Sequence, residues 1–419
     1  METIMQSNKT KSSPSKLLLF LAVLGPGLVV MLADTDAGSA ILAAQSGAQW
    51  GYKLLGLQLV LVPILYIAQE LTVRLGLVTG MGHGELIKAK FGSMWAWLSV
   101  STLVISCVGA IITEFSGLAG VGALFGVHAW IMMFLAVLFL AVMAWTGSYQ
   151  SVERIALLIG AFELAFVYVA WKSHPSLNDL VQGIINIPIH NKDYLYMAAG
   201  TVGAVIMPWM IFYQQSAVLD KGLTVKHLPP ARVDTAIGAC VTQLIMISIL
   251  VFTAASLGTT HPGISLNTVS DISKAITPNL GEITGKILFA LGMTGAALVA
   301  SIVVSLTAAW GLGEVMGYKR SLEHKPSEAP LFYCVYTLTL IIGGVIVATG
   351  FINLVKLSIA VEVMNALLLP IVLGFLFLLA RKTLPEDYKL KGIYGVIVGI
   401  ILFITAGFGL VAGIWGAFT

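Results

Sequence analysis

The sequence predicts an all-α integral membrane protein with 11 transmembrane helices, and two observations lead to this fold class. Of the 419 residues, 58% are hydrophobic and only 10% are charged, whereas a soluble protein of this size needs far more charge to cover its surface. The apolar runs last about 20 residues, which is the length of a membrane-spanning helix. Barrel strands alternate over only about 10 residues. Because lipid admits only helices and closed barrels, we expect helices.

The apolar segments follow one another with short connections and with no soluble domain between them. They are expected at 17–45, 53–78, 95–122, 127–147, 151–172, 194–219, 232–257, 283–312, 330–350, 354–380 and 393–416. A polar N-terminal tail, residues 1–16, precedes them and lacks a signal-peptide cleavage pattern. We therefore predict one membrane domain over residues 17–419.

The positions of the Lys and Arg residues predict the orientation. If the N-terminus is cytoplasmic, 17 of the 23 Lys and Arg residues fall in the tail and the cytoplasmic connections, and 6 fall on the opposite side. Cytoplasmic loops carry such an excess of positive charge. We expect a multi-pass protein of the cell membrane with a cytoplasmic N-terminus and an external C-terminus.

Two segments are interrupted at corresponding places. Segment 17–45 carries Asp-Ala-Gly-Ser at 36–39, and segment 194–219 carries Gly200, Gly203 and Pro208 near its middle. Glycine weakens a helix and proline removes a backbone hydrogen bond. Paired interruptions are typical of inverted-repeat transporters, although kinks that serve packing alone are an alternative. The pattern predicts repeats at about 17–172 and about 194–380, with an extra helix at about 393–416.

The two interruptions carry candidate metal ligands. Asp36 offers a carboxylate and Ser39 a hydroxyl, while Ala204 offers a freed carbonyl and Met207 a thioether sulfur. Hard oxygen ligands suit Mg²⁺, Ca²⁺ and Mn²⁺, and sulfur favours softer transition metals. The mixed set favours Mn²⁺ or Fe²⁺ over Mg²⁺. Two alternatives stay open: Met207 fills the core, and Asp36 is a structural carboxylate paired within the bundle.

These residues lie in motifs that resemble the natural resistance-associated macrophage protein (NRAMP) family of divalent-metal transporters. "DAGSAILAAQSGAQWG" at 36–51 is similar to the family's Asp-Pro-Gly-Asn followed by Gln-Ala-Gly-Ala-Gln-x-Gly, and "GAVIMPW" at 203–209 is similar to Gly-Ala-Thr-Val-Met-Pro-His. The resemblance covers most of the chain. It implies a leucine-transporter-type fold, metal uptake driven in part by protons, and a metal site at Asp36, Ser39, Ala204 and Met207.

The chain also departs from the family pattern. Ser39 replaces an asparagine, Trp209 replaces a histidine, and Glu114 alone remains of an acidic pair in the third segment. A shorter ligand leaves room for a retained water, which Mg²⁺ gives up reluctantly. The resemblance therefore extends to the NRAMP-related magnesium transporter branch, whereas Met207 favours Mn²⁺. We expect proton coupling to be weakened or absent.

Further intramembrane acids are candidates for an additional ion or proton site. Asp34 lies two residues before Asp36, so near an unwound turn the two carboxylates could share one cation or proton; facing a watery vestibule or capping the break are alternatives for Asp34. Glu362 is either an outer ligand or gate, or a packed and protonated glutamate. Glu114 and Trp209 complete this additional set.

The sequence thus predicts a divalent metal cation transporter that imports Mn²⁺ or Mg²⁺ by alternating access. The alternative is an organic-substrate carrier of the same fold, for an amino acid or amine. An intramembrane enzyme is disfavoured, because Asp34 and Asp36 are poorly placed for a facing dyad. The sequence also has no Walker-type phosphate loop, no H-E-x-x-H and no G-x-S-x-G motif. We expect the metal ion as substrate rather than as cofactor, the lipid bilayer as surroundings and no nucleic-acid partner. The oligomeric state is left open.

Overall fold

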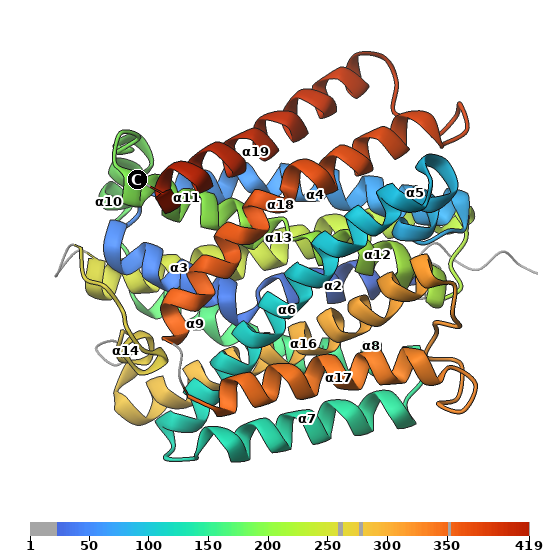
Figure 1. Ribbon diagram of the computed structural model, residues 1–419. Helices are drawn as coiled ribbons and strands as arrows, with labels where there is room; N and C mark the ends of the chain where they lie inside the picture. The colour runs from blue at the N-terminus through green and yellow to red at the C-terminus, as the bar shows by residue number, and fades with distance from the viewer. Residues whose placement is uncertain (1–22, 259–262, 276–279, 351–352, 419) are drawn as a thin grey trace, which may run out of the picture.

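The computed structural model of this protein describes residues 23–258, 263–275, 280–350 and 353–418. The predicted tail, residues 1–16, lies outside them. Within the described residues all regular elements are helices (Figure 1). Ten helical stretches are long and apolar enough to cross a membrane, and a pair of helices bent by 48° makes an eleventh. The predicted all-α class with 11 spans is confirmed.

The first half of the chain forms five spans. Their helices are α2 (Pro26–Asp34), α3 (Ala37–Trp50), α4 (Leu55–Thr79), α6 (Ser93–Leu124), α7 (Ala129–Thr146), α8 (Tyr149–Gly160) and α9 (Leu164–Lys172). The bent pair α2–α3 is the first span, and a 3₁₀ turn, η1 (Ala161–Glu163), joins α8 to α9.

The second half forms six spans. Their helices are α11 (Lys192–Val205), α12 (Pro208–Asp220), α13 (Leu228–Thr253), α16 (Glu282–Met316), α17 (Pro330–Ala348), α18 (Leu354–Lys382) and α19 (Gly392–Phe418). Both predicted interruptions are present, between α2 and α3 and between α11 and α12.

Among the described residues, three short helices lie in connections that the hydropathy pattern leaves as loops: α5 (His83–Phe91), α10 (Leu177–Ile185) and α14 (Val269–Lys274). In α10 the apolar residues Leu177, Val181 and Ile185 recur every four positions and are all exposed. One apolar face on a short helix is typical of a helix that lies in the membrane interface. Such a helix is too short to register as a span.

The broken spans lie at the centre of the bundle. The most apolar stretch of Lys192–Asp220 is 89% buried inside the protein, whereas that of Ala129–Thr146 is only 28% buried. In Figure 1, α7 and α17 run along one edge and α19 along the opposite edge, while α18 crosses obliquely from the middle of the bundle to the edge beside α19. The peripheral helices therefore face lipid and shield the two interruptions.

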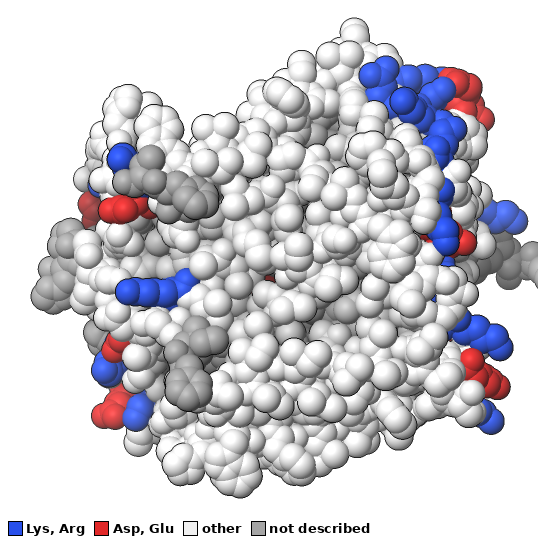
Figure 2. Space-filling view, in the orientation of Figure 1, with Lys and Arg blue, Asp and Glu red and all other residues white. Residues whose placement is uncertain are grey.

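Charged side chains gather at the two ends of the helices. Figure 2 shows a wide band without Lys, Arg, Asp or Glu between two charged rims, and the rim beside α5 and the α18–α19 connection is the richer in Lys and Arg. An uncharged band of this kind matches the hydrocarbon core of a bilayer, which is about 30 Å thick. The fold thus places the helix interruptions near the middle of the membrane.

Glycine allows the central helices to approach closely. A Cβ at Gly203 on α11 would lie 2.7 Å from the backbone nitrogen of Ala366 on α18, and still closer to the carbonyl oxygen of Glu362. At Gly374, also on α18, an added Cβ would meet nothing within 4 Å. The contact between α11 and α18 therefore requires Gly203, whereas α18 has no such need of Gly374.

We predict that Gly203→Ala destabilises the protein by about 1–3 kcal/mol, because the methyl group forces two backbones apart. Thermal unfolding of the detergent-purified protein should show a lower melting temperature for Gly203→Ala. The matched variant Gly374→Ala should melt at or slightly above the wild-type temperature, since alanine favours helix more than glycine does. Equal melting temperatures for the two variants would contradict this packing argument.

Candidate metal site

The two helix interruptions meet at the centre of the protein. Thr35 and Asp36 separate α2 from α3, and Ile206 and Met207 separate α11 from α12. The Ser39 hydroxyl, in the first turn of α3, donates a hydrogen bond of 3.1 Å to the carbonyl oxygen of Ala204. This bond joins the first interruption to the second, so the candidate ligands that are far apart in the sequence come together.

Asp36 combines a structural role with an unoccupied ligand atom. It is the N-cap of α3 in extended backbone conformation, and its Oδ1 accepts a 2.6 Å hydrogen bond from the Ser39 backbone N–H. Aspartate is a preferred residue at this position because its side chain satisfies a free helix N–H. The second oxygen, Oδ2, is fully buried and has no hydrogen-bond partner. A buried carboxylate oxygen without a partner is costly, and a bound cation would remove that cost.

Proline at position 208 explains why the Ala204 carbonyl is available. In a continuous helix this carbonyl would accept from the N–H of residue 208, and proline has no N–H. The Ser39 hydroxyl occupies one lone pair of the oxygen, and a carbonyl oxygen has two. Pro208 therefore frees a backbone ligand, the Ala204 carbonyl, four residues before the start of α12 at Pro208.

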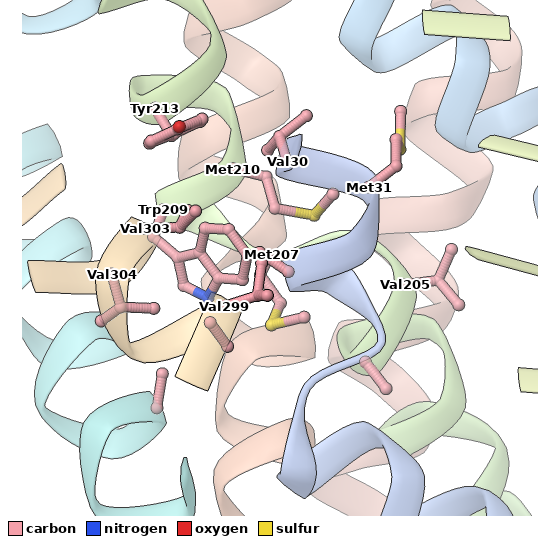
Figure 3. Packing of buried hydrophobic residues seen from close by; sticks show 14 of the residues in the cluster. Val30, Met31, Val205, Met207, Trp209, Met210, Tyr213, Val299, Val303 and Val304 are labelled. Carbon is pink, nitrogen blue, oxygen red and sulfur yellow. The ribbon is translucent and has the colours of Figure 1, made fainter. Parts of the chain in front are cut away.

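Met207 is the residue immediately before α12, and it is fully buried in extended backbone conformation. Figure 3 shows its sulfur at the unwound turn, beside Trp209. Its neighbours along the chain, Ile206 and Pro208, are buried as well. The thioether thus reaches the centre of the protein from the same interruption that frees the Ala204 carbonyl.

Trp209 forms a wall of this region. Its ring is fully buried, and Val299, Val303 and Val304 of α16 surround it in Figure 3. The indole N–H is buried without an acceptor. Indole is a donor only, so its nitrogen offers a cation no lone pair and does not pick up a proton as imidazole does.

Glu114 and Glu362 approach the start of α3 from two other helices. Glu114 on α6 accepts a 2.9 Å hydrogen bond from the backbone N–H of Ala37, where the helix N-terminus favours negative charge. Glu362 on α18 faces Gly38, because a Cβ on that glycine would lie 2.5 Å from Glu362 Oε1. This Oε1 is buried without a partner, whereas Oε2 accepts from Asn365.

Asp34 turns towards α13. Its Oδ2 accepts a 3.3 Å hydrogen bond from the Thr242 hydroxyl, which also lies 2.8 Å from the Thr35 hydroxyl. The Asp34 side chain is fully buried. In this conformation Asp34 therefore contacts α13 through Thr242.

One buried acid was missed by the sequence reasoning. Glu163 lies in the 3₁₀ turn between α8 and α9, and both of its carboxylate oxygens are buried. Its neighbours at the first interruption are the Thr35 hydroxyl and the carboxylates of Asp36 and Asp34. A mid-helix 3₁₀ turn often marks a functional position. The signal was present in the sequence as the single acid inside the apolar segment 155–171.

The described residues contain no group of three or more His, Cys, Asp and Glu side chains placed to hold a metal ion. Asp36, Glu114 and Glu362 are neighbours, but their three carboxylates are not arranged to bind a metal ion by themselves. The donor set that the structure does assemble is mixed: one carboxylate, one hydroxyl, one carbonyl and one thioether.

Contacts at both ends of the helices close the site. At one end, Gln45 Oε1 accepts from the backbone N–H of Leu266 in the connection before α14. At the end rich in Lys and Arg, Asp234 accepts from the backbone N–H groups of Gly25 and Gly27 at the start of α2. All four candidate ligands are buried, so none of them is exposed to solvent in this structure.

Comparison with known proteins decides the family. A family model described as natural resistance-associated macrophage protein-like matches residues 27–414. This chain belongs to that family. The resemblance stated from the motifs is therefore confirmed, and the match covers every span of the membrane domain from α2 to α19.

Curated relatives of this family member include a protein named divalent metal cation transporter MntH from Chromohalobacter salexigens, which is 28% identical over 316 residues, 72% of each chain. A protein of the same name from Staphylococcus aureus (strain Newman) is 31% identical over 208 residues, 48% of this chain and 46% of that one.

Solved structures share the fold of this family member. A manganese transporter of Eremococcus coleocola, in complex with an aromatic bis-isothiourea compound, matches with a TM-score of 0.77 at 18% identity and covers 95% of this chain and 87% of its own. MhsT in complex with L-phenylalanine matches with a TM-score of 0.62 at 14% identity, over 96% and 99% of the two chains. The leucine-transporter-type arrangement is therefore confirmed.

Lys221 holds the start of α2 closed, and we predict that removing its charge opens this end. Its ammonium donates to the carbonyl of Leu24 at 2.8 Å and to Glu153 at 2.6 Å. In Lys221→Met a cysteine introduced at Ser39, with the three native cysteines replaced, should react several-fold faster with a cationic thiol reagent.

The control is Lys226→Met, because Lys226 lies on the same end of the protein and is exposed. It should leave the reactivity of the introduced cysteine unchanged. If both variants gave the same labelling rate, Lys221 would not be part of the closure.

Proposed function

We propose that this protein imports a divalent metal cation into the cytoplasm by alternating access, with Asp36, Ser39, Ala204 and Met207 as the ligands. The proposal rests on two oxygen atoms at the joined interruptions that can bind a cation. Asp36 Oδ2 has no hydrogen-bond partner, and the Ala204 carbonyl lacks the helix N–H that Pro208 cannot supply. Membership in the family supports it, because curated relatives are named as divalent metal cation transporters. These relatives are transporters rather than enzymes.

We assign Mn²⁺ ahead of Mg²⁺ as the ion. Carboxylate, hydroxyl and carbonyl oxygens bind either ion, whereas a thioether favours a softer transition metal. Met207 is buried at the interruption rather than packed on a distant face of the bundle. The short Ser39 side chain leaves room for a water on the ion. The solved relative of similar fold from Eremococcus coleocola is titled as a manganese transporter, which agrees with this order.

We propose that proton coupling is weakened or absent. The histidine position of the family holds Trp209, whose ring does not exchange protons near neutral pH. Glu114 is held by the Ala37 N–H at the start of α3. Uptake does not need a proton gradient, because a potential of 100 mV supplies about 2.3 kcal/mol per charge, roughly twice that for a divalent ion.

Glu362 is the best placed further ligand. It approaches Gly38, between Asp36 and Ser39, with an oxygen that has no partner. Asp34 likewise has one oxygen, Oδ1, without a partner, while its Oδ2 accepts from Thr242 on α13. Because Glu362 is the acid that approaches Gly38 at the start of α3, we assign Glu362 to the ion site and leave Asp34 outside the ligand set.

We also propose one transporter domain over residues 17–419, with the end rich in Lys and Arg facing the cytoplasm. The excess of positive charge at the connections between α4 and α6 and between α18 and α19 supports this orientation. It places the N-terminus inside and the C-terminus outside.

The organic-substrate alternative fits the site less well. MhsT, which shares the fold, is described in complex with L-phenylalanine, so the fold alone does not exclude such a substrate. However, half-helix N-termini in this fold commonly receive an anionic substrate group, and here Asp36, Glu114 and Glu362 occupy the start of α3. Three acids at that place oppose a substrate carboxylate.

The main test is the charge of Asp36. We predict that Asp36→Asn lowers Mn²⁺ uptake into proteoliposomes by more than about a hundredfold, beyond the 10–100-fold typical of outer-sphere partners. The amide oxygen still accepts from the Ser39 N–H, so the melting temperature should remain close to wild type. The control is Asp387→Asn, at an exposed position, which should transport normally. Wild-type uptake by Asp36→Asn would overturn the proposal.

The choice of ion is tested by Met207→Leu, which conserves volume and removes the sulfur. Uptake of Mn²⁺ at a clamped membrane potential, with and without excess Mg²⁺, should show strong Mg²⁺ competition for the variant and weak competition for wild type. A pH dye inside the same vesicles should show no acidification during uptake. Equal competition in both proteins would refute the role of the sulfur, and acidification in wild type would refute uncoupled transport.

A further inference from the structure

A groove between α18 and α19 opens on the outside of the bundle. It has a volume of about 690 Å³. Its residues come from these two helices, from Pro370 to Arg381 on α18 and from Gly395 to Leu410 on α19. Val396, Ile400 and Phe403 line it with 53–78% of their surfaces exposed. The groove therefore faces the lipid and not the transport pathway.

Glycine residues give the groove its depth. At Gly374 on α18 and Gly407 on α19, an added Cβ would meet no other atom within 4 Å. Both glycines line the groove, so each opens onto the empty space within it. A glycine weakens a helix interior by about 1 kcal/mol relative to alanine, and the neighbouring helix does not require either one for close approach.

On α18 the groove has about the length of one leaflet of a bilayer, and on α19 it extends further, from Gly395 to Leu410, over about 22 Å. From Pro370 to Arg381 there are 11 residue steps, which at 1.5 Å each make about 16 Å along the helix. Half of a hydrocarbon core of about 30 Å is about 15 Å. A chain that enters at Arg381 and follows α18 therefore ends near the middle of the membrane, as a fatty acyl chain does.

The positive charge of Arg381 and Lys382 at one end of the groove favours an anionic ligand. Arg381 lines the groove, and Lys382 follows it at the end of α18. Among the described residues, no carboxylate forms an ion pair with either side chain; Glu386 engages Lys389 and Lys391 instead. The Arg381 guanidinium lies over the Phe377 ring, 5.7 Å from its centre. Figure 2 shows the basic cluster of this connection at the rim of the uncharged band.

We infer that the α18–α19 groove binds one anionic phospholipid from the leaflet on the side rich in Lys and Arg. An acyl chain lies along Gly374 and Gly407, and the phosphate-containing headgroup pairs with Arg381 and Lys382. Basic pockets between membrane helices recognise such headgroups, and arginine pairs with phosphate through two parallel hydrogen bonds. The binding requires no transported ion, so it is independent of the proposed function.

A second copy of the chain fits this groove less well. Two copies in one membrane related by a twofold axis along its normal present the same surface to each other. Arg381 and Lys382 of both copies would then meet at the same end of the interface. Like charges at an interface are costly, whereas an anionic headgroup neutralises them.

Native mass spectrometry of the full chain in detergent tests the inference. Phosphatidylglycerol and phosphatidylcholine with identical acyl chains are added separately. The wild-type protein should retain one phosphatidylglycerol at a concentration about tenfold below that needed for phosphatidylcholine, which is about 1.4 kcal/mol. Arg381→Gln with Lys382→Gln should abolish this preference while both lipids still bind weakly.

A second pair of variants tests the contribution of the open groove independently of the charge at its end. Gly374→Leu and Gly407→Leu place side chains in open space, so they should fold normally and lose both lipids. Lys389→Gln is the matched control at the same end, because Lys389 already pairs with Glu386 at 2.9 Å, and it should retain the preference. The inference is overturned if the preference survives the Arg381 and Lys382 substitutions, if the leucine variants bind lipid as wild type does, or if a dimer forms in place of the lipid complex.

Discussion

The hydrogen bond between the Ser39 hydroxyl and the Ala204 carbonyl is the contact on which the centre of this protein depends. It exists because two helices stop at the same depth: Asp36 caps the start of α3, and Pro208 cannot donate to Ala204. Each interruption leaves polar atoms unsatisfied in a region without water. The two interruptions satisfy each other in part, and the atoms that remain are those suited to a cation.

Buried acidity is the second constraint. Asp34, Asp36, Glu114, Glu163 and Glu362 are all fully buried near the interruptions. The hydrogen bonds described above for these acids come from hydroxyls, amides and backbone N–H groups rather than from Lys or Arg. The ion pairs of Glu70 with Arg74 and of Glu153 with Lys221 lie near the helix ends. This separation leaves a centre rich in carboxyl oxygens between neutralised rims. Such a centre supplies ligands for a cation and none for an anion.

The spans and the interruptions were predicted from the sequence, whereas the positions of particular side chains were not. The spans followed from runs of about 20 apolar residues, and the interruption at Pro208 followed from a missing N–H. Glu163 was overlooked, because hydropathy averages over a window and one acid does not alter it. The contact of Asp34 with Thr242 also could not be predicted from the sequence. The two residues are 208 positions apart, and only the packing of α13 on α2 brings them together.

Hydropathy, capping and proline chemistry act within a few residues of the chain, so the fold class, the two interruptions and the types of ligand they carry could be predicted from the amino acids alone. The folded protein was needed to learn that Glu362 approaches Gly38 and that Asp34 contacts Thr242. It was also needed to learn that Gly374 and Gly407 open a groove towards lipid while Gly203 allows a close helix contact. Each of these features depends on what faces the residue from another helix. Local patterns contain no information about that neighbour.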